Sequence, residues 1–94
     1  MAAMRASVYE RVVRITHIYL GPAADRFIDR QVENHLGKMP KALTLADLSQ
    51  LIDWIRVAVS LMTDDAEIVD EYIEQLERLS RPPSQDRQHN GTRS

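Results

Sequence analysis

The histidines are the side chains of this chain with the chemistry for metal or haem binding. His17 and His35 fall in different predicted helices, and neither has a second ligand three or four residues away on its own helix. His89 lies in a polar C-terminal segment without a recognisable pattern around it. A metal site needs three or four converging ligands, so the sequence predicts no metal site and no cofactor.

Nucleophilic catalysis finds no better support in the sequence. The chain has no cysteine, which excludes thiolate nucleophiles, thiolate-zinc sites and disulfides. Ser7, Ser49 and Ser60 fall in helical patterns rather than on the strained turn that exposes a serine nucleophile. The only glycines are Gly21, Gly37 and Gly91, too far apart for a phosphate-binding loop. We therefore predict no catalytic residues, no small-molecule substrate and no enzymatic activity.

A run of carboxylates in the C-terminal half resembles a calcium site only in composition. Its members are Asp64, Asp65, Glu67, Asp70 and Glu71. A calcium-binding loop needs alternating ligands around a central glycine, and this run has no glycine. The apolar helical period also continues through it, so the run is interpreted as the capped, solvated face of a helix.

Charge is distributed unevenly along the chain, although the net charge is only −2. Residues 1–41 carry net +3, residues 42–79 net −7 and residues 80–94 net +2. The acidic last helix either lies against the basic first two helices or meets a basic partner. A strongly basic DNA-binding surface is not expected, because phosphate would repel that helix and the basic residues of the first two helices alternate with acidic ones. We accordingly expect no nucleic-acid partner.

Hydrophobic periodicity predicts the helices that must position any site. Apolar residues recur at helical spacing over residues 5–20, 22–36, 45–62 and 65–79. No strand-like alternation and no apolar run long enough to span a membrane occur. The fold class is therefore all-α, a compact four-helix domain over residues 1–80. Residues 81–94 contain no apolar side chain and are expected to be a disordered tail.

The predicted third helix is apolar over most of its circumference. One stripe contains Leu48, Leu51, Ile52, Ile55, Val59 and Met62. A second, adjacent stripe contains Trp54, Ala58 and Leu61. A helix at the edge of a bundle normally buries one stripe, so we expect the second to be at least partly exposed as an interface. The alternative is that Trp54, the only tryptophan, belongs to the core. On the acidic last helix, Glu67, Glu71 and Glu74 are further interface candidates.

Two connections carry recognisable local signals. Gly21-Pro22 ends the first helix and opens the second, with Gly21 expected at positive φ and Pro22 in the first turn. Thr44 and Asp47 are spaced as a capping box, with aspartate in the place usually held by glutamate. Both pairs are predicted to be structural.

The stretch Tyr19-Leu20-Gly21-Pro22, followed by Phe27-Ile28 and Arg30, resembles a motif of small helical accessory modules. Such modules are appended to bacterial serine/threonine kinases, nucleotide cyclases and response-regulator-like proteins. Leu48-Ser-Gln-Leu51 and the acidic last helix occupy the places of later elements, so the resemblance covers about residues 15–79. The middle loop is longer here, and we expect the module to stand alone, without a kinase or receiver domain. The resemblance implies a signalling role without catalysis.

The function expected from these observations is that of a non-catalytic protein–protein interaction module in bacterial regulation. It would be cytoplasmic, have a protein partner and no membrane partner, and self-associate, as a homodimer, through its third helix. The alternative is a small DNA-binding transcriptional regulator. A small-molecule sensor that uses the apolar interior is a third possibility.

Overall fold

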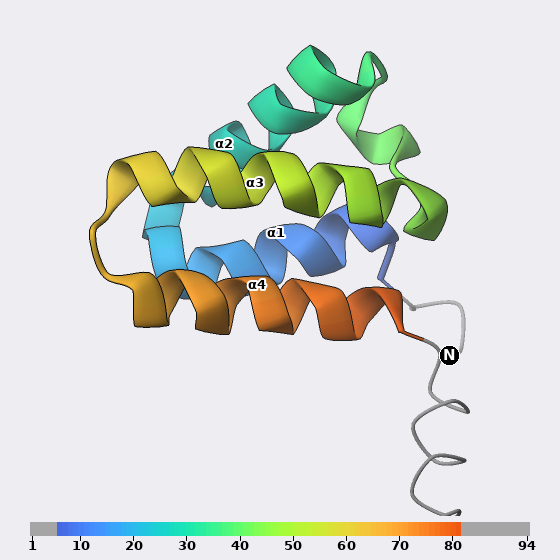
Figure 1. The fold of residues 1–94 in the computed structure, drawn as a ribbon. Coiled ribbons are helices and arrows are strands. Elements are labelled where there is room, and N and C mark those ends of the chain that lie inside the picture. The colour runs from blue at the N-terminus through green and yellow to red at the C-terminus, as the bar shows by residue number, and fades with distance from the viewer. Residues whose placement is uncertain (1–5, 82–94) are drawn as a thin grey trace, which may run out of the picture.

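The protein is all-α in the computed structural model, which describes residues 6–81 (Figure 1). The long helices are α1 (Val8–Leu20), α3 (Leu48–Met62) and α4 (Ala66–Ser80). The expected tail lies outside the described residues from residue 82 onward. Because α1 and α4 run in opposite directions and contact each other, the start of α1 and the end of α4 lie at the same end of the bundle (Figure 1).

The second predicted helix is not one continuous α-helix. A 3-10 turn, η2 (Gly21–Ala23), leads into the short helix α2 (Ala24–Gln31), which continues as a π-helical turn, η3 (Val32–Leu36). The expectation of four regular helices is wrong at this point. The segment is wound tightly as a 3-10 turn at its start and more loosely as a π-helical turn at its end. The π turn ends at Gly37, which has φ 64° and ψ 31°, the left-handed conformation expected of a glycine cap.

The helix starts are fixed by side chains that satisfy free backbone amides. Ser7 and Glu10 form a capping box at α1, with the Glu10 amide donating to Ser7 Oγ at 3.1 Å and the Ser7 amide donating to Glu10 Oε1 at 3.2 Å. Asp65 caps α4 by accepting from the amides of Glu67 and Ile68. Gly21 has φ 63°, the positive value expected from the sequence, and Pro22 lies in the first turn of η2.

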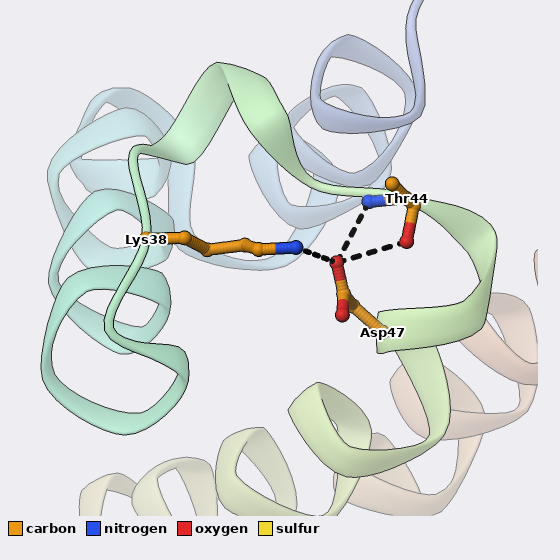
Figure 2. A network of polar contacts seen from close by, with 3 residues as sticks. All are labelled: Lys38, Thr44 and Asp47. Atoms are coloured by element: carbon orange, nitrogen blue, oxygen red, sulfur yellow. Dashed lines mark hydrogen bonds and ion pairs between the residues drawn. The ribbon is translucent and has the colours of Figure 1, made fainter.

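The connection before α3 is more ordered than the predicted loop. Two 3-10 turns, η4 (Pro40–Ala42) and η5 (Leu45–Asp47), precede the helix, so α3 itself begins at Leu48. Thr44 and Asp47 form a capping box. Asp47 Oδ2 accepts from the Thr44 amide at 3.0 Å, from Thr44 Oγ1 at 2.9 Å and from Lys38 Nζ at 2.7 Å (Figure 2). One carboxylate oxygen thus joins the chain after η3 to the start of α3.

We expect Asp47→Ala to lower the free energy of unfolding by about 1 kcal/mol near neutral pH, as for the loss of a helix cap. The hydrogen bond from Lys38 and those from Thr44 lower the pKa of Asp47 from its ordinary value of 3.8. A lowered native-state pKa stabilises the fold above the unfolded-state pKa, and this contribution is lost as the pH falls through the native-state value. Urea unfolding of both proteins should therefore show a difference that shrinks below pH 4. A constant difference would mean that the carboxylate charge is unimportant.

The core is formed by one face of each helix. The buried apolar side chains are Val12, Ala24, Ile28, Val32, Leu43, Leu48, Leu51, Ile52, Ile55, Val59, Val69, Tyr72, Ile73 and Leu76. Met62, predicted in the core stripe of α3, is instead 58% exposed, and Ile68 of α4 is 44% exposed. Met62 is the last residue of α3 and Ile68 lies in the first turn of α4, so both flank the connection between these helices.

A polar pair lies within this core and joins the first helix to the last. Thr16 Oγ1 donates to the carbonyl oxygen of Val12 at 2.8 Å, and it lies 2.6 Å from the hydroxyl oxygen of Tyr72. Because the single Thr16 proton is used on Val12, the Tyr72 hydroxyl donates to Thr16. Both side chains are buried, and burial raises the pKa of Tyr72 to about 12.

Candidate interaction surface

A metal site in residues 6–81 would require three or four ligands that converge. Within this range, no group of three or more histidine, aspartate or glutamate side chains lies close enough to hold a metal ion. His17 is exposed on α1 and lines an open hollow with Asp25 and Asp29 of α2. The described helices also include none that is long and apolar enough to cross a membrane.

The most distinctive surface lies on α3, on the side of the helix turned away from the core. Trp54 is 40% exposed, Val57 is 54% exposed and Leu61 is 84% exposed. Their spacing of three and four residues places them on one face of the helix, with half-buried Ala58 at its edge. We call these four residues the α3 patch. Val57 was not among the predicted interface residues, although its spacing from Trp54 and Leu61 places it on the same helix face.

Trp54 is held in a fixed orientation by a histidine from another element. The His35 ring, in the π turn η3, stacks on the indole of Trp54 with ring centroids 3.9 Å apart and planes 5° from parallel. His35 lies in the last turn of η3 and covers one face of the indole.

Two exposed arginines of α2 lie near the C-terminal end of α3. Arg26 and Arg30 are exposed on α2 and line a small groove of about 190 Å³ together with Phe27 and with Met62 at the end of α3. Neither arginine forms an ion pair with another residue in the described part of the chain. We call Arg26 and Arg30 the basic rim.

The α4 side of the patch is acidic. Arg56, on the flank of α3, lies 3.9 Å from a carboxylate oxygen of Asp70 and 3.8 Å from one of Glu77. One arginine therefore faces two carboxylates, and the local charge remains negative. We call Asp70 and Glu77 the acidic rim.

The three glutamates predicted to take part in an interface lie elsewhere on α4. Glu67, Glu71 and Glu74 are all exposed. Glu71 accepts a hydrogen bond from the hydroxyl of Tyr19 at 3.1 Å, which directs it toward α1, and Glu74 pairs with Arg78 along its own helix. The α4 carboxylates that reach α3 are the acidic rim, so the two halves of the predicted interface do not form one surface.

The α3 patch, Trp54 stacked on His35 and the two charged rims are the features on which a function can be argued. Comparison of the chain with protein-family models, with curated proteins and with solved structures gave no match.

Proposed function

We propose that this chain is a non-catalytic protein–protein interaction module that self-associates through the α3 patch. The observation that supports the proposal is the exposure of Trp54, Val57 and Leu61 on one face of a helix whose opposite face fills the core. An apolar strip that is solvated in the monomer gains free energy when a partner covers it.

Other exposed apolar side chains give weaker support for an interface. Ile18, Met39 and Leu45 are exposed too, but each lies on a different element, α1, the loop after η3 and η5. Single exposed apolar residues are common on soluble proteins and need no partner. A tryptophan in an apolar strip, stacked on a neighbouring ring, is the type of residue that dominates binding energy in interfaces.

The wider setting that we propose is regulation or signalling in a bacterial cytoplasm. It rests on the resemblance of Tyr19-Leu20-Gly21-Pro22 and the following helix to accessory modules of kinases, cyclases and response-regulator-like proteins. In the structure Gly21 and Pro22 form the turn between α1 and α2, a role that fits such a module.

The double substitution Trp54→Ala with Leu61→Ser tests the self-association. We expect it to weaken dimerisation by more than about tenfold while the circular dichroism of the helices is retained, because both side chains lie outside the core. Sedimentation equilibrium over a series of concentrations measures the association. Ile18→Ser, an exposed apolar residue of α1, is the matched control and should leave the dimer intact.

Two outcomes contradict the proposal. The first is that the unsubstituted protein is monomeric at every concentration. The second is that the double substitution unfolds the chain, which would place Trp54 among the core residues.

A further inference from the structure

Two hollows meet at the end of the bundle where α1 and α3 both finish (Figure 1). One has a volume of about 190 Å³ and lies against the basic rim of α2, with Phe27 beside it. The other has a volume of about 270 Å³ and is lined on the α4 side by Ile68 and Tyr72. Leu20 and Met62, the last residues of α1 and α3, line both hollows, so the two are adjacent. We call the two hollows together the end groove.

The α4 part of the end groove has a buried apolar floor and an exposed apolar edge. Val59 and Tyr72 form the floor and belong to the core. Met62 and Ile68 form the edge and are exposed, although each continues an apolar face of its helix. An apolar group that filled this hollow would remove these side chains from water, which is favourable.

The α2 part of the end groove adds positive charge. Arg26 and Arg30 are four residues apart, so they lie on one face of α2, and neither forms an ion pair with another described residue. Asp25 and Asp29 of the same helix line a different hollow, and Asp29 accepts a hydrogen bond from the Tyr9 hydroxyl at 2.6 Å. Arg26 borders that hollow as well, whereas Arg30 lines only the end groove of the two.

We infer that the end groove binds a small amphiphile, a single alkyl chain that ends in a carboxylate. The carboxylate binds the basic rim, because guanidinium groups donate paired hydrogen bonds to carboxylates. The chain extends past Leu20 and Met62 into the α4 part of the groove. The reverse orientation is disfavoured, since Glu71 accepts a hydrogen bond from Tyr19 at 3.1 Å and places a negative charge beside that part.

The size and place of the end groove determine which class of ligand fits. Pockets for drug-sized ligands have volumes of about 300–1,000 Å³, and each of the two hollows is smaller than that. One unbranched chain therefore fits better than a lipid with two chains. No residue that lines the groove belongs to the α3 patch, so the inference is independent of self-association.

Titration with decanoate, below the concentration at which it forms micelles, tests the inference by calorimetry. We expect saturable binding at one site. Octanoate, which is two methylene groups shorter, should bind about tenfold more weakly, because each buried methylene strengthens binding roughly fourfold. A decyl chain with a trimethylammonium head should bind far more weakly than decanoate. Equal binding of the cationic amphiphile, or no saturable binding of decanoate, would overturn the inference.

Substitutions at exposed positions test both ends of the ligand without disturbing the core. Arg30→Gln should weaken decanoate binding roughly tenfold through the lost charge-assisted hydrogen bonds, whereas Arg14→Gln, on α1 and outside the groove, should not. Met62→Ser should also weaken binding roughly tenfold through lost apolar contact. Its matched control is Met39→Ser, an exposed methionine in the loop after η3. Equal effects of each variant and its control would contradict the assigned site.

The methyl resonances of the methionines locate the bound chain directly. On addition of decanoate, the NMR signal of the Met62 methyl group should shift, and that of Met39 should not. If the indole signal of Trp54 shifted while Met62 did not, the ligand would lie on the α3 patch, and the end groove would be excluded as its site.

Discussion

Replacing Tyr72 with alanine is expected to lower the free energy of unfolding by about 3–5 kcal/mol, as for other large aromatic residues removed from a core. Tyr72 is only 1% exposed and is the largest of the fully buried side chains among the described residues. Its ring lies 5.0 Å from that of Tyr19. Domains of this size are commonly stable by about 5–15 kcal/mol, so the variant would lose a large share of its stability. Urea unfolding followed by circular dichroism measures the loss.

Tyr72→Phe separates the contribution of the ring from that of the hydroxyl. In this variant the ring remains, and the Thr16 hydroxyl keeps its hydrogen bond to the carbonyl of Val12. We therefore expect a loss of only about 0.5–1.5 kcal/mol, typical of one hydrogen bond. If phenylalanine proved as harmful as alanine, the hydroxyl pair and not the packed ring would hold α1 against α4.

Gly21→Val is expected to lower the free energy of unfolding by more than about 1 kcal/mol. Gly21 combines φ 63° with ψ −142°, a region of backbone space that is open almost only to glycine. A Cβ atom added there would meet no other atom within 4 Å, so the cost arises in the backbone and not from a clash. We expect α1 to remain helical in the folded variant. Thermal unfolding followed by the helical signal therefore measures the loss of stability.

Gly37→Asn is the control for this substitution. Gly37 has nearly the same φ, 64°, but its ψ of 31° falls in the left-handed helical region, which asparagine tolerates. Gly21→Asn should therefore be clearly more destabilising than Gly37→Asn. Equal effects would show that positive φ alone, and not the combination of angles at Gly21, determines the cost.

Periodicity predicted the all-α fold class and most core positions, since the buried faces of α3 and α4 follow the expected spacing. It failed where burial depends on a partner far away in the sequence. Thr16 is polar and was not placed in the core, but it is buried because Val12 and Tyr72 satisfy its hydroxyl. Met62 was placed in the core stripe of α3, but it is the last residue of the helix and is 58% exposed.

Part of the candidate surface could also be predicted from the sequence. The partial exposure of Trp54 and Leu61 followed from the excess of apolar residues on α3. The stack of His35 on Trp54 could not be predicted, because it depends on a π turn that widens the helix before Gly37. The capping box of Ser7 and Glu10, in contrast, was present in the sequence as the pattern Ser-x-x-Glu and was overlooked.

The start of α1 and the end of α4 lie at the same end of the bundle (Figure 1). Chains whose ends are close together tolerate insertion into a loop of another protein and also circular permutation, because joining the ends strains neither. The α3 patch lies along the side of the bundle and not at the end where the chain enters and leaves. A host protein attached at either end, or at both, would therefore leave this surface open, and the module could be transplanted as a single unit.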